Sequence, residues 1–103
     1  MKAEHISIAT TLEDVPNIGP AIAARLRDIG VHNPIELREL DALQTYDKLC
    51  QVTRCNVDVT WLDRLLSAVS FATGAAPAPW QDFSEQRRQL LQLREHAATD
   101  PDS

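Results

Sequence analysis

Apolar residues recur along most of the chain at spacings of three and four, which is the period of an amphipathic α-helix. The clearest run lies between Asp58 and Gly74, where a continuous stripe is formed by Leu62, Leu65, Leu66, Val69 and Ala72. Trp61, Ala68 and Phe71 widen this stripe beyond half of the helix, so we expect it to be central and mostly buried. No stretch alternates apolar and polar residues for long enough to predict a strand. The pattern therefore predicts an all-α fold.

Start and stop residues divide the chain into five to six short helices. Proline at a first helical position and glycine just past a last one mark boundaries at Pro20 and Gly30. Other starts are marked by a capping residue with an acid or amide three positions later, as in Thr10 with Glu13, Asp41 with Gln44, and Asp82 with Glu85. The predicted helices span about 12–15, 20–29, 34–40, 42–54, 59–73 and 83–97.

At 103 residues the chain has room for one compact domain. We expect an N-terminal arm at 1–10, a helical core at 11–74, a linker and packed C-terminal helix at 75–97, and a disordered tail at 98–103. Phe71 lies about 180° from Leu62 on the helical wheel and would face solvent by itself. A returning segment that carries Trp80 and Phe83 would cover it.

The segment Val15-Pro16-Asn17-Ile18-Gly19-Pro20, which leads into the helix 20–29, resembles the helix-hairpin-helix motif of DNA-handling proteins. A glycine commonly stands where this chain has Asn17, a residue that tolerates left-handed backbone angles. Four backbone N–H groups are expected to lack intrahelical partners at the positive end of the helix dipole, those of Ile18, Gly19, Ala21 and Ile22. Such a helix start can hold a phosphate.

Arg25 is the side chain that could join this site, because it lies on the same outer face as Ala21. The alternative is that Arg25 pairs with Asp28, three residues later. Both readings remain open.

A wider resemblance covers about residues 12–90. It is carried by the hairpin, by Tyr46-Asp47-Lys48-Leu49-Cys50, by Asp58, by Ala68-Val69-Ser70-Phe71-Ala72-Thr73-Gly74, and by Trp80 and Phe83. These segments resemble small bacterial proteins labelled mitomycin-resistance-like or "pathogenicity locus" and, more distantly, the C-terminal domain of TfoX-type competence regulators. The resemblance implies a tandem helix-hairpin-helix fold whose second unit is degenerate, with Arg54-Cys55-Asn56-Val57 as a glycine-free hairpin. It implies no mechanism.

Charge and composition narrow the function. Ten Lys and Arg against fifteen Asp and Glu give a net charge of −5, which opposes broad attraction to nucleic acid or to an anionic membrane. No apolar run is long enough for a membrane span or a signal peptide, so we expect a cytoplasmic protein. Cys50 and Cys55 fit neither a redox motif nor half of a zinc site, and we expect reduced thiols, with Cys50 facing inward.

Candidate chemistry elsewhere is sparse. His32 and Glu36 lack a third ligand, and Arg87 and Arg94 share a helix face that is either a second anion site or simply solvated. No phosphate-binding glycine loop, nucleophile elbow or carboxylate cluster occurs in the sequence. We therefore expect no enzyme, metal, cofactor or small-molecule substrate.

The sequence predicts a small non-catalytic binding module, either a monomer or a weak dimer. The favoured ligand is the DNA phosphate backbone, contacted without base recognition through the 16–22 hairpin by Asn17, Ile18, Gly19, Ala21, Ile22 and Arg25. The alternative is a protein-interaction or dimerisation module that uses the small outer face of Ala21, Ala24 and Arg25.

Overall fold

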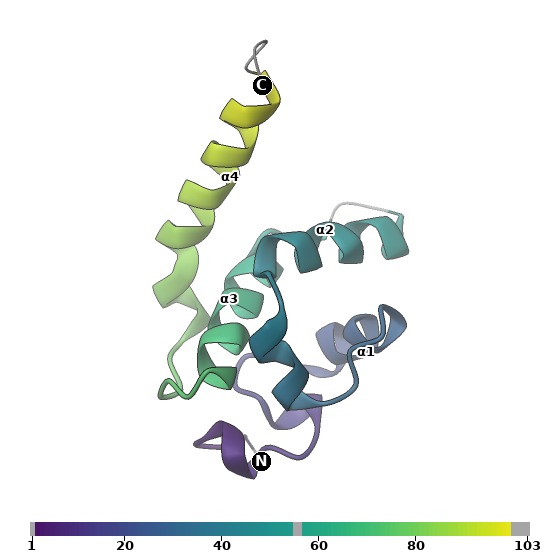
Figure 1. The fold of residues 1–103 in the computed structure, drawn as a ribbon, viewed down its shortest axis with the longest axis vertical. Coiled ribbons are helices and arrows are strands. Elements are labelled where there is room, and N and C mark those ends of the chain that lie inside the picture. The colour runs from purple at the N-terminus through teal and green to yellow at the C-terminus, as the bar shows by residue number, and fades with distance from the viewer. Residues whose placement is uncertain (1, 55–56, 100–103) are drawn as a thin grey trace.

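The computed structural model describes the backbone of residues 2–54 and 57–99 and the side chains of these ranges up to Glu95. It contains four α-helices, α1 (Pro20–Asp28), α2 (Ala42–Thr53), α3 (Thr60–Ala72) and α4 (Ser84–Thr99), arranged as in Figure 1. Four short 3₁₀ turns accompany them, η1 (Ile6–Ile8), η2 (Leu12–Asp14), η3 (Pro34–Glu39) and η4 (Trp80–Phe83). The described ranges contain no strand, so the all-α prediction is confirmed.

Most of the predicted helix boundaries are confirmed by the local geometry. Helix α1 begins at Pro20, and Gly30 follows its end with φ +94°, an angle that suits glycine. The Asp41 carboxylate caps α2 by accepting the Gln44 N–H at 2.9 Å. Gly74 follows α3 with φ +110°.

The predicted capping box of Thr10 with Glu13 is wrong. The carboxylate of Asp14 takes that place, with Oδ2 accepting the N–H groups of Thr10 and Thr11 at 2.9 and 3.0 Å. The Glu13 carboxylate instead accepts hydrogen bonds from both terminal nitrogens of Arg27, at 3.0 and 2.6 Å. The bidentate pair gives the Glu13 carboxylate two charge-assisted hydrogen bonds, whereas the predicted capping box would give it one. The segment from Leu12 forms a single 3₁₀ turn rather than an α-helix.

The last helix also begins differently from the prediction. Asp82 and Glu85 do not start it, because the 3₁₀ turn η4 precedes α4 and the helix begins at Ser84. The Ser84 hydroxyl donates at 2.7 Å to the buried carboxylate of Asp63 in α3. This long-range partner sets the start of α4, which then runs to Thr99 rather than to 97.

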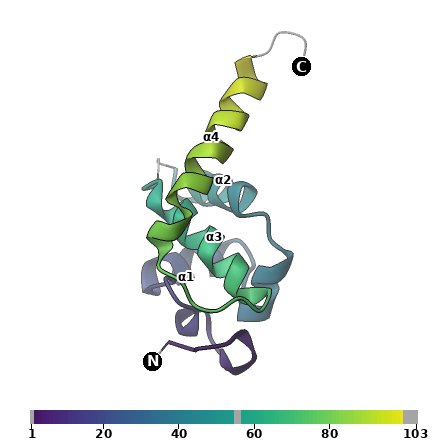
Figure 2. The same ribbon diagram turned by 90° about the vertical axis from the view of Figure 1, so that its left-hand side faces the viewer.

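Helix α3 is the centre of the molecule, with α2, η3, η4 and α4 packed around it (Figure 2). Its core residues Leu62, Leu65 and Ala68 are almost completely buried. Phe71, on the other side of the helix, is 2% exposed. The segment after Gly74 therefore packs on α3, as its aromatic residues predict, whereas Trp80 and Phe83 themselves are only partly buried.

The second expected hairpin connects α2 to α3. Arg54 ends α2 in a left-handed conformation with φ +58°. Cys55 and Asn56 lie outside the described residues, so the expected loop thiol is not placed. Cys50 has a free thiol and packs partly buried against the core, in agreement with its inward prediction.

Helix α4 extends beyond the rest of the molecule in both views (Figures 1 and 2). The Cα atoms span 47 × 26 × 21 Å, and the projecting half of α4 contributes to the longest dimension. Leu90 and Leu91 still pack against the core, but Leu93 is 67% exposed. Only the first part of α4 is thus integrated into the fold.

Candidate functional site: the 16–22 hairpin and its pocket

The hairpin turn is built around one left-handed residue and one buried anchor. Asn17 has φ +71°, a region open to asparagine, as the sequence predicts for a position where glycine is common. The side chain of Ile18 is completely buried and anchors the turn to the core. The Asn17 amide also donates to the Ser67 hydroxyl at 2.9 Å and to the Ala78 carbonyl at 2.8 Å.

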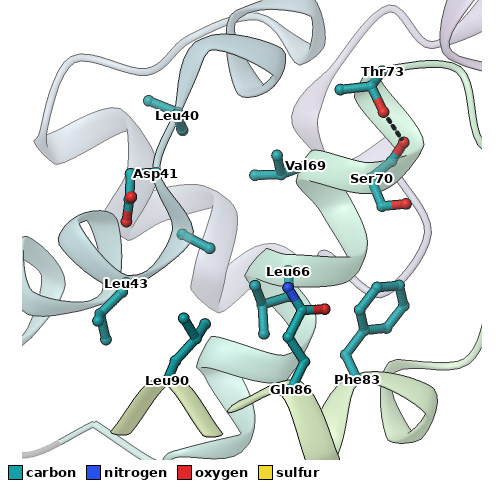
Figure 3. Close-up of a pocket in the computed structure, with 11 residues that line it drawn as sticks. Leu40, Asp41, Leu43, Leu66, Val69, Ser70, Thr73, Phe83, Gln86 and Leu90 are labelled. Carbon is teal, nitrogen blue, oxygen red and sulfur yellow. Dashed lines mark hydrogen bonds between the residues drawn. The ribbon is translucent and has the colours of Figure 1, made fainter. Parts of the chain in front are cut away.

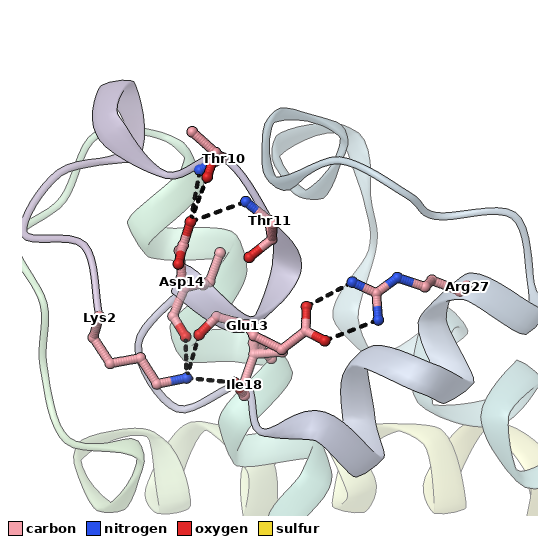
Figure 4. A network of polar contacts seen from close by, with 8 residues as sticks. Lys2, Thr10, Thr11, Glu13, Asp14, Ile18 and Arg27 are labelled. Carbon is pink, nitrogen blue, oxygen red and sulfur yellow. Dashed lines mark hydrogen bonds and ion pairs between the residues drawn. The ribbon is translucent and has the colours of Figure 1, made fainter.

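Lys2 holds the carbonyl side of the same turn (Figure 4). Its ammonium donates to the backbone oxygens of Glu13 at 2.7 Å, Val15 at 3.1 Å and Ile18. Burial lowers the pKa of Lys2, and the nearby charge of Asp14 partly opposes that shift. The N-terminal arm therefore supplies a cation that binds the backbone carbonyl oxygens of the hairpin turn.

The N–H side of the turn remains open. Within the described chain, the N–H groups of Gly19, Ala21 and Ile22 donate to no acceptor. The Ile18 N–H is different, because it donates to the Val15 carbonyl at 3.1 Å, so its predicted role as a free donor is wrong. Gly19 has φ −90°, and an added Cβ would meet no heavy atom within 4 Å.

The side chains of the predicted site divide into two groups. Ala21 is exposed and Ile22 is 4% exposed, so Ile22 can contribute only its backbone. Arg25 pairs with Asp28 at 3.2 Å, which answers the question that the sequence left open. Asn17, Gly19, Ala21 and Ile22 thus lie together at the turn and the start of α1, whereas the Arg25 side chain is engaged by Asp28.

A pocket of about 340 Å³ lies beside the turn, between the start of α1 and the start of α3. It is lined by Gly19, Pro20, Ala21, Ile22, Asp58, Thr60, Trp61 and Arg64. Two helix N-termini, each with partial positive charge, therefore meet at one concavity.

Arg64 brings a full positive charge to this pocket. Its Nη1 donates to the Asn17 carbonyl at 3.4 Å, and its Cζ atom lies 5.0 Å from the centre of the Trp80 ring. Among the ion pairs of the described residues, Arg64 takes part in none. The guanidinium is thus held in place by contacts other than an ion pair of the described residues.

The other polar wall is acidic. The Asp58 carboxylate accepts the Thr60 N–H at 2.9 Å at the start of α3. That backbone hydrogen bond is the main reason why the pKa of Asp58 is lowered, and the charge of Arg64 contributes further. Asp58 therefore limits how much negative charge the pocket accepts.

Sequence reasoning missed Arg64 and placed Trp61 in the core, whereas Trp61 is partly buried and also lines the pocket. Both residues lie three apart on one helix face, a spacing that is visible in the sequence. Which element that face meets is a property of the tertiary structure, and no pattern in the sequence identifies it.

The other candidate residues are used structurally. Arg87 pairs with Asp63 and Arg94 with Asp47, which argues against a second anion site. Arg94 is exposed, as the solvated-face alternative expects, whereas Arg87 is only 17% exposed. Glu36 accepts the His32 N–H at 3.0 Å. Among the described residues, no group of three or more His, Cys, Asp or Glu side chains could hold a metal ion.

A second concavity is an apolar groove of about 480 Å³ where the start of α2, the outer face of α3 and the start of α4 meet (Figure 3). Its apolar lining consists of Leu40, Ala42, Leu43, Leu66, Val69, Phe83 and Leu90. Its polar lining consists of Asp41, Ser70, Thr73 and Gln86, of which only Asp41 is charged, so it offers no charge cluster for chemistry.

Comparison with known proteins places the chain in a family. The family model described as "Pathogenicity locus" matches residues 5–89. The Mitomycin resistance protein McrB from Streptomyces lavendulae is 28% identical over 85 residues, which span 82% of this chain and 81% of that protein. No solved structure matches. Within the described part of the chain, no helix has both the length and the apolar character needed to cross a membrane.

Proposed function

The chain belongs to the Pathogenicity locus family, and from that premise we propose that it is a small, non-catalytic, DNA-binding module. The hairpin 16–22 is its helix-hairpin-helix element, and it contacts the phosphate backbone without reading bases. Phosphate contacts position a protein on DNA and carry no sequence information.

One observation carries this proposal. Within the described residues, the backbone N–H groups of Gly19, Ala21 and Ile22 donate to no acceptor, and these three residues line the same pocket as Arg64. Each helix-start N–H favours an anion, and a charge-assisted bond from arginine adds to it. Gly19 leaves space for a phosphate oxygen to approach the backbone.

Electrostatics limit the affinity. The net charge of −5 repels DNA everywhere except at such a local site. With one to three phosphate contacts, the Kd should fall in the range of roughly 10⁻⁴–10⁻⁶ M of non-specific binding. The module would therefore act together with a partner that adds affinity.

Fluorescence anisotropy with labelled duplex DNA over a salt series tests the proposal. We expect a log–log salt slope of about one to three and weaker binding by Arg64→Gln. Arg88→Gln is the matched control, because Arg88 is exposed and pairs with Glu85 away from the hairpin. Gly19→Val, at a backbone angle that valine can adopt, should fold and should block the phosphate. Undiminished binding by a folded Gly19→Val protein would refute the hairpin site.

A protein-interaction module is the second candidate. The apolar groove, the exposed Leu93 and the acidic net charge favour it, as does the exposed Ala21 on the small outer face of α1. The same salt series separates the two candidates, because absence of DNA binding even at low salt favours a protein partner.

A further inference from the structure

We propose that the pocket between the starts of α1 and α3 receives one unpaired base of a DNA strand whose phosphate lies at the hairpin. This inference rests on the proposed function and deepens it, because it names the form of DNA that the site prefers. It is carried by the cavity and its side chains rather than by the helix start.

The size and one wall of the cavity suit a single nucleic-acid base. Its volume of about 340 Å³ is near the lower end of ligand pockets and fits a single small group. Trp61, which is partly buried, is one of the residues that line it, and every base can stack on the face of an aromatic side chain. Stacking requires a base that is not already stacked in a duplex.

The charges of the cavity are ordered along its wall. Arg64 is next to the hairpin turn, where its Nη1 reaches the Asn17 carbonyl, and Asp58 lies at the start of α3. A second phosphate beside Asp58 would be repelled. An exocyclic amine would instead be favoured, because the carboxylate has lone pairs beyond the one that accepts the Thr60 N–H.

This arrangement predicts a preference among bases. Adenine, cytosine and guanine carry an exocyclic amine that can donate to Asp58, whereas thymine has no amine and offers only its ring N3–H as a donor. In an intact duplex these amines are paired. The site therefore favours DNA with an unpaired amine-bearing base, such as adenine or cytosine, over perfect duplex.

The test uses the full chain and labelled hairpin oligonucleotides that differ only in one bulged base. We expect an adenine or cytosine bulge to bind about 10-fold more tightly than perfect duplex, with a thymine bulge in between. Trp61→Leu should remove the advantage of all three bulges, with folding monitored by helical circular dichroism.

Asp58→Asn keeps the inference testable if Trp61→Leu is unstable, since the side-chain oxygen of asparagine can still accept the Thr60 N–H. It should abolish the preference for adenine and cytosine over thymine. Asp41→Asn is the matched control, because the Asp41 carboxylate also accepts a backbone N–H at the start of a helix and Asp41 does not line this pocket.

The outcomes separate the two proposals. Equal binding of bulged and perfect duplex overturns this inference and leaves the hairpin function standing. A bulge preference that survives both pocket variants overturns the location. Absence of binding to every oligonucleotide at low salt refutes the proposed function and, with it, this inference.

Discussion

The side-chain amide of Asn17 donates a hydrogen bond of 2.8 Å to the carbonyl oxygen of Ala78, which lies 61 residues later in the chain. The same amide donates to the Ser67 hydroxyl at 2.9 Å. The hairpin turn is therefore bonded both to the central helix and to the linker that leads into η4. Asn17 therefore has two roles: it adopts the left-handed backbone angle of the turn, and its side chain ties the turn to two distant segments.

Asn17→Gly separates these two roles. Glycine accepts φ +71° without strain but loses both hydrogen bonds, so we expect a loss of about 1–2 kcal/mol in the free energy of unfolding. Asn17→Ala should be less stable still, because alanine also strains at a positive φ. Urea unfolding of the wild type and of both variants gives the order of their free energies of unfolding. Equal stability of the wild type and Asn17→Gly would show that the tie contributes nothing.

Acid should weaken the hairpin region through Asp14. Hydrogen bonds from the Thr10 and Thr11 backbone lower its pKa from an ordinary 3.8 to about 2. Because the folded pKa is lowered, the stabilisation is complete above the unfolded pKa and disappears as the pH falls from about 5 toward 2. Glu13, whose pKa the Arg27 hydrogen bonds lower, adds to the same loss. Urea midpoints measured against pH should fall less steeply in Asp14→Asn, and equal slopes would contradict this origin.

The two ion pairs that hold α4 should differ in strength. The Asp63 carboxylate is fully buried and lies 2.9 Å from Nε of Arg87, whose side chain is 17% exposed. Arg94 and Asp47 are each nearly half exposed. We expect Asp63→Ala to cost roughly 2–3 kcal/mol, since it leaves Arg87 without its carboxylate and Ser84 without its acceptor. Arg94→Ala should cost less than about 1 kcal/mol. Thermal or urea unfolding of both variants tests the contrast, and similar costs would contradict it.

The segment after Gly74 should be required for a stable fold. Trp80 is partly buried and lies against Arg64, so Trp80→Ala should lower Tm by roughly 10 °C. A chain ending at Gly74 should be marginal or aggregate, because it uncovers the outer face of α3 around Phe71. Leu93→Ala is the control, since Leu93 is 67% exposed and should be nearly neutral. Near-equal Tm values for the wild type, Trp80→Ala and the shortened chain would show that the segment is not integrated.

Local rules predicted most of the helices. Pro20, Gly30, Asp41 and Gly74 act through backbone geometry within one or two turns, so their effects can be read from the sequence. The rules failed at Glu13 and at Asp82, where a local cap competed with a distant charged partner. Arg27 took the carboxylate of Glu13, and Asp63 took the Ser84 hydroxyl. Short 3₁₀ turns such as η3 likewise depend on how the flanking helices pack.

The sequence by itself determined the all-α class, the order of the helices and the left-handed Asn17. These follow from propensity, capping and apolar period, which act over a few residues. Only the tertiary structure decided that Lys2 binds the carbonyls of the turn, and that Arg64 and Trp61 reach the hairpin from α3. The physical reason is that a helical wheel gives the direction of a side chain around its own axis, whereas the neighbour it meets depends on how two distant helices pack.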